Sequence, residues 1–175
     1  AAALLKAINL IGTGTGLGRL LRQGSRAMAT IVGHNSIEFA PQVKGLEIPG
    51  YEPRALQTMS LGFAVGTRGA DHNRSGAYEI DFSDAADRRN GTADAARLAV
   101  DTEDKAAIMD SLILCKFLRG VFTNYFAETA EILNLITGWD LNQSAMQNMA
   151  RGIIDAKKEF NIRCGWASSR PSNFL

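Results

Sequence analysis

Apolar residues recur every three or four positions along most of the chain, with polar residues between them. The first such run extends from Leu4 to Ile11, and the second from Leu17 to Ile31. Because this spacing places the apolar side chains on one face of a helix, it predicts a helix, a turn and a second helix at the start of the chain. The same spacing predicts longer helices near the end, over Glu103–Lys116, Val121–Ile136 and Asn142–Phe160.

Two segments in the middle of the chain are less regular. Between Pro53 and Gly69 alanine and glycine are frequent, which predicts a buried helix that starts near the proline and packs closely against another backbone. The segment from Ser83 to Asp104 is polar, acidic and interrupted by glycine. Such a composition is typical of a surface connection, and we expect at most one short helix within it.

One stretch has the alternation expected of a strand. The alternation is set around Pro41 by Ile37, Phe39 and Val43, and it can extend to Ile48. The proline cannot donate a backbone hydrogen bond, which restricts the stretch to a sheet edge or a short ribbon. The sequence therefore predicts a mainly α fold, a multi-helical, bundle-like domain with at most one short β-ribbon within residues 35–50.

The glycine-rich stretch LIGTGTGLGRLL, residues 10–21, raises the question of a phosphate-binding loop. A dinucleotide-binding fingerprint needs a strand before the glycines and the spacing G-x-G-x-x-G. Here a helix is predicted before them, and Leu17 or Arg19 stands where the last glycine is required. We therefore interpret the stretch as a helix C-cap and connector.

Composition and charge narrow the range of functions. The chain has 175 residues, 46% of them hydrophobic, which is enough for one compact domain, or one domain and a small lobe. A net charge of +1 argues against binding to long nucleic acid or to an anionic membrane. No apolar run reaches the length of a membrane span, and two cysteines are too few for a disulfide framework. We expect a cytoplasmic protein.

Two histidines are candidates for chemistry near neutral pH. His72 lies in the stretch TRGADHNRS, between Asp71 and Arg74, where an arginine could hold an anion or a polar heterocycle. From spacing alone we prefer a simpler interpretation, in which this stretch is a glycine-capped helix C-terminus decorated with solvated charge. His34 follows a glycine that ends a helix, and the same interpretation is stronger there.

Three further residues are candidates for chemistry. Asp110 and Cys115 lie in DSLILCKF, about 140° apart on a regular helix, so both face one ligand only if the helix breaks there. Without other information we expect Cys115 in the core and Asp110 as a cap or interhelical contact. Cys164 has no nearby base or second cysteine, which supports neither a catalytic pair nor a zinc site.

Several of these segments together resemble a known family. KGLEIPGYEPRALQTMSLGFAVGTRGADHNRS, DSLILCKF, TGWD and FNIRCG occur in the order and at about the spacing of the C-terminal part of the aldehyde:ferredoxin oxidoreductases, the tungsten-pterin enzymes. The resemblance spans nearly the whole chain. It implies that residues 1–175 are the C-terminal helical region of such an enzyme, in which two mostly helical domains close over a bis-pterin tungsten site held by an N-terminal domain.

The resemblance also implies roles for individual residues. His72 matches the family histidine that lies close to the metal and is proposed to move a proton. Arg74 falls where the family has a basic side chain touching the pterin. Asp110 and Cys115 match the ends of the pattern D-x-x-G-L-C, whose aspartate binds a pterin amine and whose cysteine is the last ligand of a [4Fe-4S] cluster.

The chain departs from that pattern at two positions. Leu114 fits it as a cofactor-binding position, but Ile113 replaces the usual glycine, which puts the close backbone approach to the pterin in doubt. Cys164 stands where the family usually has a glutamate, so its thiol is a departure rather than a ligand.

The resemblance implies a function in the longer enzyme. That function is oxidation of aldehydes to carboxylic acids, with electrons passing through a [4Fe-4S] cluster to ferredoxin. The expected partners are the N-terminal pterin-binding domain, the cluster-binding segment, ferredoxin and the aldehyde substrate. The remaining cluster and pterin motifs are not in this sequence, and one cysteine cannot hold a cubane cluster, so we expect the chain alone to be free of cofactor and inactive. A helical scaffold without catalysis is the alternative; a nucleic-acid-binding helix-turn-helix is weaker, because the net charge is near zero.

Overall fold

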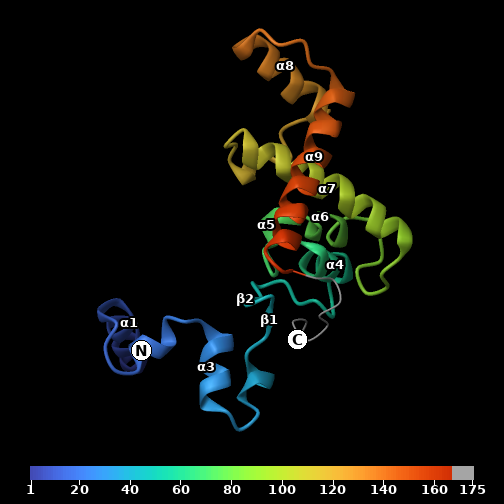
Figure 1. The fold of residues 1–175 in the computed structure, drawn as a ribbon. Helices are drawn as coiled ribbons and strands as arrows, with labels where there is room; N and C mark the ends of the chain where they lie inside the picture. Colours follow the sequence, from blue (N-terminus) through green and yellow to red (C-terminus); the bar gives the residue numbers. More distant parts are fainter. Residues whose placement is uncertain (167–175) are drawn as a thin grey trace.

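The computed structural model describes residues 1–166, which form a mainly helical structure with one β-hairpin. Figure 1 shows an arm of helices set to one side, joined through the hairpin to a larger helical body. We define the arm as residues 1–35 and the body as residues 42–166. The expected fold class, mainly α with one short ribbon, is confirmed.

The arm contains three helices, α1 (Ala2–Thr13), α2 (Gly18–Leu21) and α3 (Ser25–Val32). Helix α1 ends at Gly14, whose left-handed backbone forms its C-cap, as the sequence predicts. The second helix expected here is instead divided into α2 and α3. A side chain at Gly18 would place its Cβ 1.9 Å from the carbonyl oxygen of Leu10, so glycine lets α2 pack directly on the backbone of α1.

The hairpin follows a short 3-10 helix, η1 (Ser36–Phe39). Strands β1 (Gln42–Val43) and β2 (Leu46–Glu47) pair antiparallel, with Gln42 opposite Glu47 and Val43 opposite Leu46. The extended stretch is therefore shorter than its alternation predicts and begins only after Pro41, because the residues before the proline form the 3-10 turn. A carboxylate oxygen of Glu47 accepts a hydrogen bond from the backbone N–H of Ser25 at 2.8 Å, which ties the arm to the hairpin.

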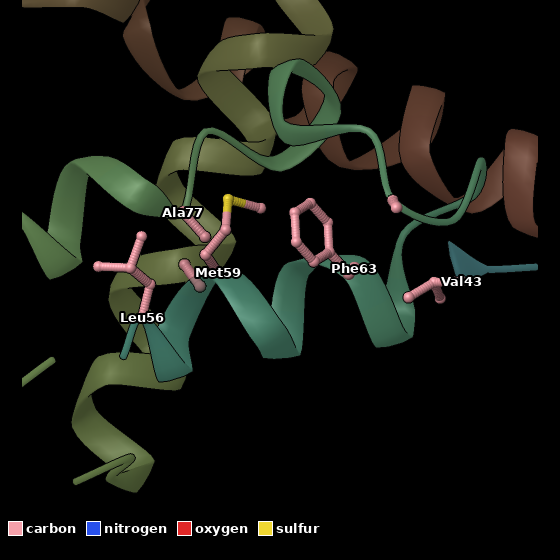
Figure 2. Packing of buried hydrophobic residues seen from close by; sticks show 7 residues of the cluster. Val43, Leu56, Met59, Phe63 and Ala77 are labelled. Carbon is pink, nitrogen blue, oxygen red and sulfur yellow. The ribbon is translucent and has the colours of Figure 1, made fainter. Parts of the chain in front are cut away.

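The first apolar cluster of the body surrounds α4 (Gln57–Val65). Figure 2 shows Met59 and Phe63 projecting from α4 between Leu56, Ala77 and Val43. Both side chains are essentially inaccessible to solvent, which confirms the buried helix expected here.

Helix α4 begins four residues after Pro53, later than predicted, because its N-terminus is capped from a distance. The buried carboxylate of Asp81 accepts hydrogen bonds from the backbone N–H groups of Thr58 (3.1 Å) and Met59 (2.7 Å). These donors have no partner within their own helix, so an aspartate supplied by α6 (Tyr78–Asp81) fixes where α4 starts.

Helix α7 (Ala93–Ser111) differs most from its prediction, because it begins ten residues before the predicted start. Thr92 caps it by accepting a hydrogen bond from the N–H of Ala95 at 3.1 Å. In its first turns only the small side chains of Ala95 and Ala99 are buried, so the segment has the composition of a polar connection although it is helical. Alanine has the highest helix propensity, and the acidic side chains of Asp94 and Asp101 are exposed.

The second apolar cluster joins the end of α7 to α8 (Tyr125–Thr137) and α9 (Gln143–Arg163). Its buried members include Ile108, Met109, Phe126 and Met146. Figure 1 shows α9 crossing α7, with α8 beside the end of α9 that lies away from α4 and α5. The helices predicted over 121–136 and 142–160 are confirmed within a few residues at each end.

Candidate functional site

The histidine motif lies at the start of a new short helix, α5 (His72–Ser75), and not at the end of the preceding one. The carboxylate of Asp71 caps α5 by accepting a hydrogen bond from the N–H of Asn73 at 3.0 Å. The interpretation of this stretch as a glycine-capped helix C-terminus is therefore wrong for His72. Helix α5 itself ends at Gly76, whose backbone is left-handed.

Packing against α4 fixes the position of α5. A Cβ at Gly62 of α4 would lie 2.4 Å from the hydroxyl oxygen of Ser75, so only glycine lets the two helices approach this closely. The small residues of the α4 segment thus allow the histidine-bearing helix to lie directly on the first apolar cluster.

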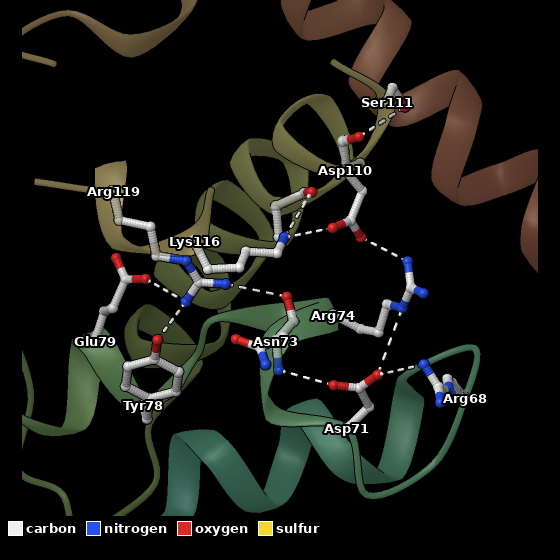
Figure 3. Close-up of polar contacts among 12 residues, drawn as sticks. Arg68, Asp71, Asn73, Arg74, Tyr78, Glu79, Asp110, Ser111, Lys116 and Arg119 are labelled. Atoms are coloured by element: carbon white, nitrogen blue, oxygen red, sulfur yellow. Dashed lines mark hydrogen bonds and ion pairs between the residues drawn. The ribbon is translucent and has the colours of Figure 1, made fainter. Parts of the chain in front are cut away.

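An ion pair connects α5 to the end of α7. The Nη1 atom of Arg74 lies 2.5 Å from Oδ2 of Asp110, and Nζ of Lys116 lies 2.6 Å from Oδ1 of the same carboxylate. Figure 3 shows Asp110 held between these two cations. The carboxylate and both cations are only partly exposed, so their interaction is screened less than a fully exposed surface pair.

This arrangement requires α7 to end where it does. The N–H of Leu114 donates to the carbonyl of Met109 at 2.9 Å, and the N–H of Ile113 donates to that of Asp110 at 3.2 Å. These two bonds form a Schellman motif, with Ile113 in its left-handed position at φ 56°. The turn brings Lys116 back to the carboxylate of Asp110, a geometry that a continuous helix would not allow.

Ile113 occupies a backbone conformation that disfavours its own side chain. A β-branched residue at positive φ is rare, whereas glycine adopts this conformation without strain. The side chain of Ile113 is 92% exposed, so it gains nothing from packing in compensation. The structure thus gives a local reason for a glycine at this position.

Leu114 and Cys115 leave the turn in different directions. Leu114 packs against the second apolar cluster and anchors the turn. The thiol of Cys115 is exposed, so the expectation of a core cysteine, made from spacing alone, is wrong. An exposed thiol at this point is accessible to a ligand.

Arg119 is a residue of this site that the sequence analysis missed. Its Nη1 atom donates to the hydroxyl of Tyr78 and to a carboxylate oxygen of Glu79, both at 2.6 Å, and its Nη2 atom donates to the carbonyl of Asn73 at 3.0 Å. Its side chain is only 14% exposed. No local sequence pattern predicts the role of Arg119, because every one of these partners is at least 40 residues away in the sequence.

His72 lies in an aromatic environment. Its ring centroid is 4.9 Å from that of Tyr51 and 6.0 Å from that of Tyr78. Burial among these rings lowers the pKa of His72 below its usual 6.5; the carboxylate of Asp71 opposes this shift and Arg119 adds to it. The two opposing charges are therefore Asp71 and Arg119, since Arg74 is turned toward Asp110.

The structure brings three of the candidate site residues together and leaves one less closely connected. His72 and Arg74 share α5, and Arg74 contacts Asp110 directly. Arg119 then links the segment that begins at Cys115 to the backbone of α5. Within residues 1–166 no hydrogen bond or ion pair joins His72 to Cys115, and the convergence of all four on one face stays a prediction.

The described part of the chain offers neither a metal-binding cluster nor a membrane-spanning helix. No group of three histidine, cysteine, aspartate or glutamate side chains there could hold a metal ion. None of its helices combines the length and apolar character that crossing a bilayer requires.

Comparison with known proteins identifies similar sequences along nearly the whole chain. A family model described as aldehyde ferredoxin oxidoreductase, domains 2 & 3, matches residues 1–173. A tungsten-containing aldehyde ferredoxin oxidoreductase of Pyrococcus furiosus is 29% identical over 181 residues, which cover 96% of this chain and 28% of that protein. Its counterpart in Thermococcus kodakarensis is 28% identical over 172 residues, 91% of this chain and 27% of that protein. The chain thus spans little more than a quarter of the length of these relatives.

Proposed function

The chain belongs to the aldehyde ferredoxin oxidoreductase family, and from that premise we propose that it forms the helical wall of a tungsten-pterin site that oxidises aldehydes to carboxylic acids. Within this wall, α5 and the turn after α7 face the cofactor. The observation that carries the proposal is the contact between Arg74 and Asp110, two residues 36 positions apart that the family resemblance assigns to the same pterin. When bound, the pterin-held tungsten supplies the two-electron oxidation.

The residues around Asp110 fit a pterin ring. Each carboxylate oxygen of Asp110 is paired with one cation and can still accept a second hydrogen bond, such as one from a ring amine. Arg74 uses Nε and Nη1 in its contacts, which leaves Nη2 to donate to a ring oxygen or nitrogen. Lys116 keeps the carboxylate charge balanced, so the site holds a polar heterocycle without an isolated buried charge.

His72 is suited to accept a proton. Because its pKa is lowered, the imidazole is neutral at pH 7 and has a free lone pair on one ring nitrogen. The ring contacts with Tyr51 and Tyr78 fix its orientation, and Asp71 stabilises the positive charge once the proton is accepted. These are the properties of a general base in aldehyde oxidation.

Cys115 supplies one thiolate for a [4Fe-4S] cluster that passes electrons to ferredoxin. Four cysteine ligands are needed, and the second cysteine of the chain, Cys164, lies at the end of α9. The other ligands would come from a cluster-binding segment elsewhere in the enzyme. On this account the chain by itself binds neither cofactor and is inactive.

The exposed apolar surface supports a role within a larger enzyme. Leu4, Leu5 and Ile8 of α1 are each more than half exposed, as is Phe117 beside the proposed site. Surfaces of this kind mark contacts with other protein segments. We assign the N-terminal pterin-binding domain as the partner that covers them.

The alternative is a helical scaffold that keeps the fold and has lost catalysis. The strained Ile113 in place of glycine is the observation that favours it, because it alters the backbone beside the pterin contact. A scaffold would have no use for a cofactor-facing carboxylate or a neutral histidine, so the two functions separate in an activity measurement.

The test uses the tungsten-loaded enzyme that contains this chain. His72→Asn keeps a polar side chain of similar size but cannot accept a proton. We expect turnover of an aldehyde to fall by about 100-fold or more while the tungsten content is kept, with a flattened acid limb in the pH-rate profile. His34→Asn, in the arm, is the matched control. Near-native turnover with an unchanged profile in the His72 variant would assign that residue a structural role and favour the scaffold.

A second variant separates the cluster from the pterin. Cys115→Ser removes one proposed cluster ligand, so we expect the cluster absorbance and the rate of ferredoxin reduction to fall while the pterin content stays. Cys164→Ser is the matched control. Full cluster absorbance and normal ferredoxin reduction in the Cys115 variant would exclude the ligand role.

A further inference from the structure

A groove of about 480 Å³ lies between the loop before α5 and the C-terminal half of α9. Arg68 of the loop and Arg74 of α5 line it on one side, and Lys157 and Phe160 line it on the side of α9. We infer that this groove binds an organic carboxylate, with the carboxylate held by Arg68 and Lys157 and an apolar body against Phe160.

The two walls of the groove are held together. The side-chain amide of Asn161 on α9 donates a hydrogen bond to the backbone carbonyl of Thr67 at 2.7 Å, and both residues line the groove. The contact joins residues 94 positions apart and sets the distance between the loop and the helix. The groove is therefore defined by the fold and does not depend on a ligand to form.

The polar lining of the groove is cationic. None of its lining residues is acidic. Asp71 engages Arg68 through Nη1, so Nη2 of Arg68 is free of this ion pair (Figure 3). This nitrogen can donate a hydrogen bond to a carboxylate oxygen, whereas Nη2 of Arg74 is the donor that we assign to the pterin.

Lys157 adds a cation that lacks an acidic partner. Among residues 1–166 no carboxylate oxygen lies within 4 Å of its ammonium group. Burial and then repulsion from Arg74 lower its pKa, while Asp110 and Glu103 oppose this shift. An anion bound between Lys157 and Arg68 would supply the ion pair that Lys157 lacks.

The size and the apolar wall of the groove indicate an organic ligand. Its volume lies in the range of small-molecule sites, about 300–1,000 Å³, and greatly exceeds that of a bare inorganic anion. The ring of Phe160 is 66% exposed, so an apolar ligand body would cover surface that water now contacts. The choice of carboxylate over phosphate rests on the proposed function, because aldehyde oxidation releases a carboxylate.

The experiment titrates the chain with benzoate at low ionic strength and follows binding by calorimetry and by NMR shifts of the groove residues. Benzamide is the neutral probe of the same shape, and inorganic phosphate is the second anion. We expect saturable benzoate binding that is tighter than that of either probe. Lys157→Gln should weaken it about tenfold, since a charge-assisted contact is lost. Phe160→Ala should also weaken it.

The control variant is Lys6→Gln, which removes the same charge from the arm and should leave benzoate affinity unchanged. Circular dichroism of each variant checks that it is folded. The inference is overturned if benzoate does not bind, if benzamide binds equally well, if phosphate binds more tightly, or if Lys157→Gln keeps native affinity. Because no turnover is measured, failure here leaves the proposed function to its own test.

Discussion

The arm and the body have the same helical pattern of apolar residues, but the apolar faces are exposed in the arm and buried in the body. In the arm, only Gly18 and Ala29 are buried, and the apolar residues of α1 face outward. In the body, the apolar faces of α4, α7, α8 and α9 meet in two clusters whose central side chains are inaccessible to solvent.

The difference shows what a hydrophobic period does and does not determine. In both regions it specifies which side of a helix is apolar, and in the body the chain itself supplies the covering surface. In the arm the chain supplies no covering surface for the apolar face of α1, which is why we assign that face to a partner domain. Interactions that stabilise the chain should therefore be concentrated in the body.

The largest expected effect compares a core phenylalanine with an arm leucine. Phe63 is 1% exposed at the centre of the first cluster, whereas Leu5 is 61% exposed on α1. Phe63→Ala should lower the free energy of unfolding of the chain by about 3–5 kcal/mol, and Leu5→Ala should change it by less than about 0.5 kcal/mol. Denaturant unfolding measures both. A loss of similar size in the two variants would mean that the arm packs on itself.

A smaller effect of opposite sign is expected at the turn after α7. Ile113→Gly relieves a positive φ without removing a buried contact, so it should raise the free energy of unfolding by up to about 1 kcal/mol. Val100→Gly is the matched change inside regular helix, where α7 has no such strain, and it should lower stability. Destabilisation by both glycines would show that the left-handed turn is not strained.

The smallest effect is a pH dependence that separates the two histidines. The folded pKa of His72 lies below the unfolded value of about 6.5, so below that value the unfolded state binds more protons than the folded state. Stability should therefore fall as pH drops through 6.5 toward the folded pKa, and His72→Asn should reduce this slope. His34→Asn removes the exposed histidine of the arm. If both variants changed the slope equally, burial of His72 among the tyrosines would not be its cause.

Sequence patterns predicted the helices that carry strong periodicity. The helices over 121–136 and 142–160 and the C-cap after α1 follow from local residues alone, and the structure shows them close to where they are expected. The starts of α4 and α7 were misplaced for different reasons. Helix α4 is capped by Asp81 from more than 20 residues away, and α7 begins in an alanine-rich stretch that lacks large apolar residues.

Local sequence patterns predicted less of the candidate site than of the fold. Spacing alone favoured solvated charge at His72 and a core position for Cys115, and both interpretations are wrong. Arg74 and Asp110 were paired only through the family resemblance, because no periodicity connects residues 36 positions apart. Arg119 was missed entirely, since its partners meet only in the folded chain.

The most direct test of the account is the pterin content of the tungsten-loaded enzyme that contains this chain, measured with Asp110 changed to asparagine. Asp110→Asn keeps the shape of the side chain but removes the charge that Arg74 and Lys116 surround and that we expect to bind a pterin amine. Asp94→Asn, in the exposed first turn of the same helix, is the matched control. The account predicts a several-fold loss of bound pterin in the Asp110 variant and none in the control; equal pterin content in both folded variants would contradict it.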